Sequence, residues 1–458
     1  MTLASLPPAD SAALSPARLA LEHQSRSFVT IPAPCLAPPA LGSEIARLEA
    51  AHRGVVAVET IGQSVLGRDI RLLSIGRGAT SILLWSQMHG DEPTATPALL
   101  DLADFLARNR EQPDVARILD RFTLRMIPML NPDGAALYER RNAQGIDINR
   151  DALMLATPEG RLLKAIRERF SPILGFNLHD QGRRTTVGST GVLSSISLLA
   201  VAGDEAGTMT PGRLRAKKVA SRIVKTLSPF IQGGIARYDE DWNPRAFGDN
   251  VTAWGSPVVL IESGGFPTNG GFRDLTRLNF IALVSTLDGL AQNDLADETA
   301  DAYDTLLRNR SDAWADIAIA GASILEPVKG TWYEADVAFD ILASDQALAG
   351  CAPARAASRV VEVGDSRVVT PGTRLIGSGW LLAAADRTKA MPAGVVTIEA
   401  LRAAHPGLAL PADDPKAVLR ALALSPTAPR RGGSAIFLLW TGRRFVSIVD
   451  GAGLEALR

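Results

Sequence analysis

The chain has 458 residues, of which 46% are hydrophobic, so it can bury a large core in one big domain with a smaller one, or in three modest domains. The formal net charge is only −1 and no long basic run occurs, which argues against a nucleic-acid-binding protein. No apolar stretch approaches the roughly 20 residues that span a bilayer, and the first residues lack a signal-peptide pattern. We therefore expect a cytoplasmic protein without a membrane span, and its oligomeric state stays open.

The N-terminal part, residues 1–40, is rich in Ala, Pro and Ser. The run "IPAPCLAPPA" at 31–40 contains too many prolines for a helix or a paired strand, so we expect an extended arm. The only cysteines are Cys35 and Cys351, and they form no CxxC or cysteine-rich spacing. They imply neither a disulfide framework nor a thiolate metal site.

The next part, residues 41–300, alternates short apolar runs with helical patterns. Runs typical of strands are "VVAVETIG", "IRLLSIG", "SILLWSQ", "FTLRMIPML", "ILGFNLH" and "PVVLIES". Segments with apolar spacing near 3.6 are "EPTATPALLDLADFLARN", "PEGRLLKAIRERF", "PGRLRAKKVASRIVKTLSPF" and "FRDLTRLNFIALVSTLDGLAQN". This alternation predicts an α/β domain in which helices cover both faces of a mixed sheet.

The last part, residues 301–458, is expected to form a smaller, β-rich second domain. Strand patterns such as "WADIAIAGASIL", "YEADVAFDILA", "SRVVEVGD" and "TRLIGSGWLLAAA" are interrupted there by Gly and Pro. The segment "SAIFLLWTGRRFVSIVD" places two apolar runs around Thr441-Gly442-Arg443, which predicts a terminal hairpin. Nothing in this part has the spacing of metal or cofactor ligands, so a structural role is favoured over binding of a carbohydrate or a partner.

The stretch "WSQMHGDEPTATPALL" contains the first candidate metal ligands. The strand "SILLW" must end near Ser86, and Pro93 suits the first turn of a helix, so His89 and Glu92 lie in the turn between them. Ligand sites collect at the carboxyl ends of strands in open α/β sheets. A His and a Glu at this spacing, with one further His, are a common catalytic zinc set. The alternative is a surface turn with a helix-capping acid, and Asp91 is interpreted as an ordinary turn residue.

Two other strand ends offer the remaining members of a zinc site. His179 follows the apolar run of "ILGFNLHDQG" and is the candidate third ligand, with a hydrogen-bonded structural histidine as the alternative. Glu262 ends the hydrophobic strand in "SPVVLIESGG", where partial desolvation would raise its pKa toward the range of a general base. The alternative for Glu262 is a solvated glutamate at the sheet edge.

The loop "NPDGAALYERRNAQGIDINRD", residues 131–151, carries a dense arginine cluster. The planar guanidinium group suits carboxylates and oxyanions. A surface salt-bridge cluster is the alternative interpretation.

Taken in order, "LGRDIRLLSIG", "HGDE", "NPDG", "RRNAQGIDINRD", "NLHDQ" and "VVLIESGG" resemble the zinc metallocarboxypeptidase family typified by carboxypeptidase A. The resemblance covers residues 45–297 and implies an eight-stranded mixed sheet and a zinc hydrolase that cleaves C-terminal peptide bonds. It implies one zinc ion per chain, bound by His89, Glu92 and His179, with Glu262 as general base and acid. Substrates would be small peptides or cell-wall peptides with a free carboxylate.

The resemblance also assigns substrate contacts. Asn149 and Arg150 would bind the substrate's terminal carboxylate, and Asp147 would orient His89. Arg140 would polarise the scissile carbonyl, with Arg141 as its rival for that role. The capping tyrosine of the digestive enzymes has no clear counterpart, and Tyr238 is the nearest candidate.

This sequence departs from the family pattern at two motifs, since "NRD" and "HDQ" stand where the digestive enzymes carry other residues. A polar substrate side chain could meet Arg245, Asp249 or Asn250 in "RAFGDNVTAW".

Two other functions compete with the carboxypeptidase. A zinc-dependent N-acyl amino acid deacylase of the aspartoacylase or desuccinylase type shares the zinc set and the Asn-Arg pair, but "NPDG" and "GIDIN" are closer to the peptidase pattern. A catalytically inactive binding module would be expected to lack a metal ligand or the general base. In this sequence the three ligand positions and the position of the base are all filled.

Overall fold

The structure is a computed structural model. The residues it describes are 14–238, 242–266, 271–311, 313–341, 358–376, 380–385, 391, 393–411, 414–422, 428–429, 436–442 and 444–449. They form two compact units that divide after Ser311. Among these residues, no helix is both long enough and apolar enough to cross a membrane.

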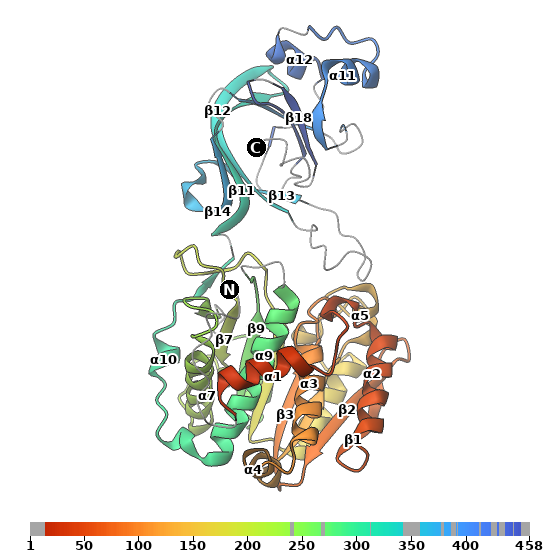
Figure 1. The fold of residues 1–458 in the computed structure, drawn as a ribbon, viewed down its shortest axis with the longest axis vertical. Helices are drawn as coiled ribbons and strands as arrows, with labels where there is room; N and C mark the ends of the chain where they lie inside the picture. The colour runs from red at the N-terminus through yellow and green to blue at the C-terminus, as the bar shows by residue number, and fades with distance from the viewer. Residues whose placement is uncertain are drawn as a thin grey trace. The chain divides into compact units, whose positions relative to one another are not determined.

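The first unit contains an eight-stranded mixed sheet in the order β1-β2-β4-β3-β5-β9-β7-β8 (Figure 1). Its strands are β1 (Val56–Gln63), β2 (Asp69–Gly76), β3 (Thr80–Ser86), β4 (Phe122–Ile127), β5 (Leu174–Asp180), β7 (Ile196–Ala200), β8 (Ile235–Arg237) and β9 (Val258–Ser263). The strands β4, β3, β5 and β9 are parallel neighbours, whereas β2 pairs antiparallel with β4 and β7 with β9. The predicted mixed sheet is confirmed.

Helices cover both faces of this sheet. One face packs on α1 (Pro16–Arg26), α2 (Pro38–Ala51), α3 (Ala95–Arg108), α4 (Pro113–Arg121), α7 (Pro211–Leu227) and α9 (Gly271–Gln292). The other face packs on α6 (Pro158–Phe170), α8 (Phe247–Ala253) and the 3-10 helix η3 (Ile148–Arg150). The remaining helical elements of the unit are η2 (Ala33–Cys35), α5 (Pro132–Leu137), η4 (Asp294–Ala296) and α10 (Asp301–Asp304). The apolar side chains of "SILLW" alternate between these faces, which explains why the whole run is buried.

The N-terminal region differs from the predicted extended arm. The helices α1 and α2 both begin with proline, and proline is tolerated in the first turn because those N–H groups have no partner within the helix. Leu19 and Leu48 then bury themselves in the core of the first unit. Cys35 lies in η2. Cys351 lies outside the described residues.

The domain boundary lies after residue 311 rather than at 300. The short strand β10 (Asn309–Arg310) pairs with β6 (Thr186–Val187) of the first unit. The Asn309 side chain also donates a hydrogen bond to the Gln181 side chain over 2.7 Å. These contacts keep the segment up to residue 310 within the first unit.

The second unit is β-rich, as predicted. Its strands are β11 (Trp314–Glu326), β12 (Thr331–Ile341), β13 (Ser358–Gly364), β14 (Thr370–Ile376), β15 (Leu381–Ala384), β16 (Gly394–Val396), β17 (Ile436–Trp440) and β18 (Phe445–Val449), with helices η5 (Ser366–Val368), α11 (Ile398–Ala404) and α12 (Pro415–Leu422). The strands β17 and β18 pair antiparallel and form the predicted terminal hairpin, of which Arg443 lies outside the described residues.

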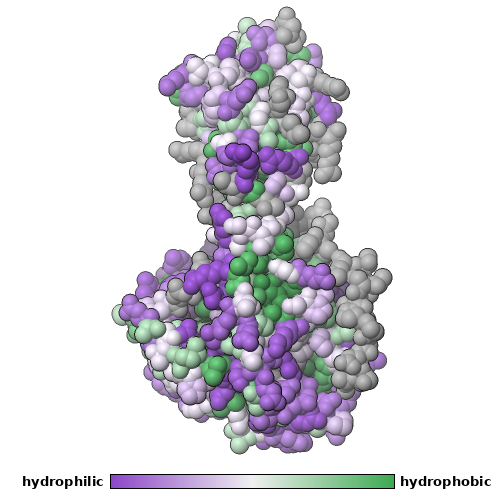
Figure 2. Space-filling model, turned by 90° about the vertical axis from the view of Figure 1, so that its left-hand side faces the viewer, coloured by the Kyte–Doolittle hydropathy of each residue, from purple (hydrophilic) through white to green (hydrophobic). Residues whose placement is uncertain are grey.

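The surface of the first unit on the side of α7 and α10 is mostly hydrophilic and includes a hydrophobic patch (Figure 2). The bulkiest apolar side chains of this unit are in the interior, where Trp85, Phe122, Phe176, Phe247 and Phe280 are fully buried.

Candidate metal centre and active site

Three adjacent parallel strands position the candidate site. His89 and Glu92 lie in the turn between β3 and α3, His179 is the penultimate residue of β5, and Glu262 is the penultimate residue of β9. The carboxyl ends of β3, β5 and β9 meet at one edge because β5 pairs with both of the other strands. This is the edge at which the sequence placed a ligand site.

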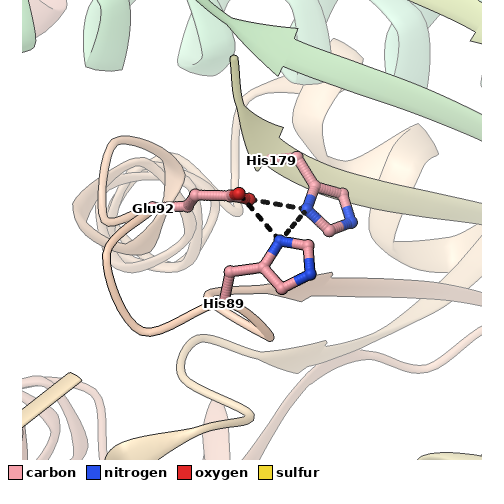
Figure 3. Close-up of side chains that lie close together, drawn as sticks. All are labelled: His89, Glu92 and His179. Carbon is pink, nitrogen blue, oxygen red and sulfur yellow. Dashed lines mark hydrogen bonds and ion pairs between the residues drawn. The ribbon is translucent and has the colours of Figure 1, made fainter. Parts of the chain in front are cut away.

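His89, Glu92 and His179 converge on one point, as Figure 3 shows. Glu92 bridges the histidines, with Oε1 2.7 Å from His89 Nδ1 and Oε2 2.7 Å from His179 Nδ1. The two Nδ1 atoms are 3.2 Å apart. All three residues are buried, and their ligand atoms lie within 4.8 Å of one another. This is the one group of three or more His, Cys, Asp and Glu residues in the described ranges whose ligand atoms lie close enough to hold a metal ion.

Asp147 fixes the orientation of His89. Its Oδ1 is 3.1 Å from His89 Nε2, and an ionised carboxylate only accepts, so the Nε2–H donates to it. The Nδ1 atom, on the opposite side of the ring, is left facing Glu92 and His179. The Asp147 side chain also caps η3 by accepting from the backbone N–H of Asn149 over 2.9 Å. The Asp147 carboxylate therefore holds both His89 of the metal cluster and the backbone of Asn149 in place.

The electrostatics of the cluster follow from burial and close charges. Burial alone would lower the pKa of His89, but the charge of Glu92 and the bonds to Asp147 and Glu92 raise the pKa to about 9. Burial would raise the pKa of Glu92, but the two histidines hold that pKa well below its usual range. Burial lowers the pKa of His179, so this imidazole is held neutral, the form that binds metal.

Of the two candidate arginines, Arg140 is the one that reaches the cluster. Its Nη1 is 3.1 Å from Glu92 Oε1, and its Nε donates to Asp147 Oδ2 over 3.0 Å. The neighbouring Arg141 donates instead to the backbone carbonyl of Gly145, within its own loop. The structure thus separates two residues that the motif "RRN" left as rivals.

Glu262 shares its sheet face with His179. The two residues are paired across β5 and β9, and directly paired residues point to the same side of a sheet. Glu262 is 5% exposed. A buried carboxylate therefore lies beside a candidate metal ligand, without belonging to the cluster of three.

The Asn149–Arg150 pair forms part of η3, close to α8. The Asn149 side-chain oxygen accepts from the backbone N–H of Phe247 over 2.9 Å. The Arg150 carbonyl accepts from Arg245 Nε over 3.3 Å. The Nδ2 group of Asn250 donates to backbone carbonyls of residues 244 and 246, and Asp249 accepts from the Asn243 N–H, so both side chains bond to the chain around α8.

Tyr238 follows β8 and is half-buried against the α6 and α8 side of the sheet. Its backbone N–H donates to the carbonyl of Leu198 over 2.9 Å.

Sequence reasoning missed the role of Asp180, although "HDQ" was noted as unusual. Its Oδ2 accepts from both the N–H and the hydroxyl of Thr94, over 3.2 and 2.7 Å. Its own N–H donates to Glu92 Oε2 over 3.2 Å. Burial raises the pKa of Asp180 to about 8. Asp180 therefore ties the start of α3, and with it the His89–Glu92 turn, to the strand that carries His179.

Comparisons with known proteins concern the first unit. The family model described as zinc carboxypeptidase matches residues 42–159. "Probable carboxypeptidase 2" of Trichophyton verrucosum (strain HKI 0517) is 33% identical over 99 residues, which cover 21% of this chain and 19% of that protein. "Carboxypeptidase SOL1" of Arabidopsis thaliana is 32% identical over 102 residues, which cover 18% of this chain and 21% of that protein. The chain thus spans about a fifth of the length of these curated relatives.

Among solved structures, the metallo-carboxypeptidase from Pseudomonas aeruginosa in complex with (2-guanidinoethylmercapto)succinic acid is 23% identical, with a TM-score of 0.45. The similarity covers 55% of this chain and 69% of that one. The family match includes the His89–Glu92 turn and the loop with Asp147 and Arg150. The similarity to zinc carboxypeptidases is thus a match of residues 42–159 to the family model and of short stretches to curated carboxypeptidases.

Proposed function

We propose that this protein is a zinc-dependent carboxypeptidase that hydrolyses the C-terminal peptide bond of a small peptide, including cell-wall peptides. The observation that carries the proposal is the buried His89–Glu92–His179 cluster, with Asp147 on His89 and Glu262 beside His179 on the same sheet face. The match of residues 42–159 to the zinc carboxypeptidase family model supports the same reaction class.

The donor set fits zinc. Two imidazole nitrogens and a carboxylate are a common catalytic zinc set that leaves a coordination position for water or substrate. The Asp147 bond keeps the proton of His89 on Nε2, so Nδ1 is available as a ligand. We assign one zinc ion per chain to these three residues. When bound, zinc would supply Lewis-acid activation of water and of the scissile carbonyl.

Glu262 is assigned as general base and then general acid. A carboxylate at this place can accept a proton from the attacking water and donate it to the departing amine. Its burial keeps it from being strongly hydrated, which suits proton transfer at neutral pH.

Arg140 and the Asn149–Arg150 pair are assigned to substrate. The Arg140 guanidinium lies beside the cluster and can stabilise the oxyanion that develops on the scissile carbonyl. Arg150 can bind a terminal carboxylate with two parallel hydrogen bonds, which would restrict cleavage to chain ends. Arg141, which bonds to its own loop, and Tyr238, which follows β8, stay lower-ranked candidates for substrate contact.

The N-acyl amino acid deacylase is not favoured, because the family match is to zinc carboxypeptidases. The deciding experiment loads the purified protein with zinc and supplies free-acid peptides, the matching C-terminal amides and N-acyl amino acids. Mass spectrometry should detect loss of one residue from the free acids alone. Equal cleavage of the amides would contradict the carboxylate-binding role of Arg150, and cleavage of acyl amino acids alone would favour the deacylase.

The cellular location stays a prediction. The sequence favours the cytoplasm over an oxidising compartment. Cell fractionation, with thiol labelling before and after reduction, distinguishes the two.

A further inference from the structure

Asn177 is a buried polar residue that the roles assigned above do not use. It lies on β5 two residues before His179, so both side chains point to the same face of the sheet. Its neighbours in register are Trp85 on β3 and Leu260 on β9, both members of the apolar cluster on this face. Asn177 is therefore a polar side chain among apolar neighbours, two residues before a candidate metal ligand on the same strand.

The amide of Asn177 has no hydrogen-bond partner among the residues described. Asn177 is 1% exposed, and neither Oδ1 nor Nδ2 finds a partner. The indole Nε1 of Trp85, its register neighbour, is likewise buried and without a partner in the described part of the chain. Native proteins satisfy the large majority of buried polar atoms, because an unmet donor or acceptor loses its hydration without compensation. Two unmet side chains side by side point to a partner other than the residues described.

Asn177 also lies close to the residues assigned to the substrate's terminal carboxylate. Asn149 accepts from the N–H of Phe247, and the next residue of α8 is Gly248. A Cβ placed on Gly248 would be 3.4 Å from Asn177 Nδ2, so the amide faces the backbone of α8. The terminal residue of a bound peptide would extend from the metal cluster to the Asn149–Arg150 pair. Its side chain would then lie over the face of the sheet that carries Asn177.

We propose that Asn177 is a specificity-determining residue that selects a carboxamide on the C-terminal residue of the substrate. A carboxamide both donates and accepts, which complements the free Oδ1 and Nδ2 of Asn177. The apolar neighbours Trp85 and Leu260 disfavour a charged side chain, which would lose its hydration among them. The inference rests on the proposed carboxypeptidase function and adds the class of terminal residue.

The test compares free-acid peptides that differ only in the last residue, Gln against Met and Asn against Leu, which are similar in size. The zinc-loaded wild-type protein should favour Gln and Asn by at least about tenfold in kcat/KM, since a site built to hydrogen-bond a substrate group rejects the analogue that lacks it. Asn177→Leu, which preserves volume, should reverse this preference with unchanged zinc content. Asn109→Leu, at the partly exposed C-terminal end of α3, is the matched control and should keep it.

A second measurement protects against misfolding of the leucine variant. Asn177→Ser keeps a small polar group at this position. Calorimetry then measures the binding of L-glutamine and of L-methionine to two zinc-loaded proteins, the Glu262→Gln variant and the Glu262→Gln, Asn177→Ser double variant. Because both proteins lack the general base, the measurement reports selectivity without turnover. Tighter binding of glutamine that disappears in the double variant supports the inference. If wild-type protein cleaves all four peptides alike, or Asn177→Leu leaves the ratios unchanged, water satisfies Asn177 and the inference is wrong although the carboxypeptidase stands. Cleavage of none of the peptides would instead contradict the proposed function.

Discussion

In the first unit, three parallel strands end side by side. The penultimate residues of β5 and β9 and the turn after β3 place two histidines and two glutamates in the protein interior. In the second unit, the described strands are mostly antiparallel and their clusters consist of aliphatic and aromatic side chains. Both sheets bury apolar residues well, yet the first alone brings potential metal ligands together among the residues described. The difference shows that strand direction, more than burial, sets where chemistry collects, because parallel neighbours end at the same edge.

The strongest test of the first unit replaces Glu262 with Gln. The amide cannot accept a proton from water, so we expect kcat to fall by a factor of about 10² to 10⁴ while zinc stays bound. Turnover by the reconstituted protein and its metal content by mass spectrometry check the two parts. A variant that loses metal but keeps activity once zinc is restored would refute the assignment.

The arginine pair offers a comparison within one loop. Arg140→Ala is expected to lower kcat/KM by about 10²-fold, because a donor to the developing oxyanion is lost. Arg141→Ala removes the same charge from a side chain that bonds to its own loop, and it should change kcat/KM little. Steady-state kinetics on one free-acid peptide distinguish them, and equal losses would show that only net charge matters.

Without bound metal, the stability of the protein should depend on pH through the protonation of the cluster. In the metal-free protein the pKa of His89 is raised to about 9, whereas an unfolded histidine has about 6.5. The folded state thus holds a proton that the unfolded state releases, so this stabilisation is complete below about pH 6.5 and lost as pH rises through about 9. The pKa of Asp180 is raised to about 8, so its carboxyl group also keeps a proton that the unfolded state releases. Asp180 therefore adds to the decline in the free energy of unfolding up to about pH 8.

Urea unfolding of the metal-free protein between about pH 6.5 and 9.5 should therefore show a falling free energy of unfolding, by up to about 3 kcal/mol from His89. His89→Gln is the control and should flatten the upper part of the curve. A flat curve for the wild-type protein would mean that His89 is neutral in the folded state.

A substitution of Asp147 should change the zinc affinity rather than the function of the general base Glu262. Asp147→Ala removes the acceptor that orients His89, and such partners typically change metal affinity by about 10- to 100-fold. Competition with a chromogenic zinc chelator measures the affinity. Glu159→Gln is a suitable control, because this buried acid bonds to Asn142 and Val65 away from the histidines.

The boundary between the units can be tested by two truncations. A chain ending after Ser311 keeps β10 and should retain zinc affinity and turnover, since its ligands all lie in the first unit. A chain ending at residue 300 loses the Asn309–Gln181 bond and the pairing of β10 with β6, each hydrogen bond contributing about 1 kcal/mol. Thermal unfolding should rank the second below the first. Equal stability would return the boundary to residue 300.

Much of this architecture was predictable because it rests on periodicity. Six of the eight strands of the first sheet, and the ends at which His89, His179 and Glu262 lie, follow from apolar runs that stop at polar residues. The short strands β7 and β8 were not predicted, because five and three residues give too little pattern. The N-terminal helices were missed because prolines in a first turn look the same in sequence as prolines in an extended arm.

Other parts of the site depend on three-dimensional relations that no local pattern contains. The contact of Asp180 with Thr94 joins residues from two separate segments. The missing partners of Asn177 can be recognised only after every neighbour in the described part of the chain has been placed. The separation of Arg140 from Arg141 depends on the direction of each side chain.

The placement of the cluster on three separate strands also bears on the order of folding. Residues 89, 179 and 262 are distant in sequence, so no fragment of the chain short of the whole β3–β5–β9 arrangement can present the ligands and Glu262 together. Contacts between such distant segments form late, after the entropy of closing long loops has been overcome. Zinc binding during refolding would therefore mark completion of the central sheet, and its time course would report when that sheet forms.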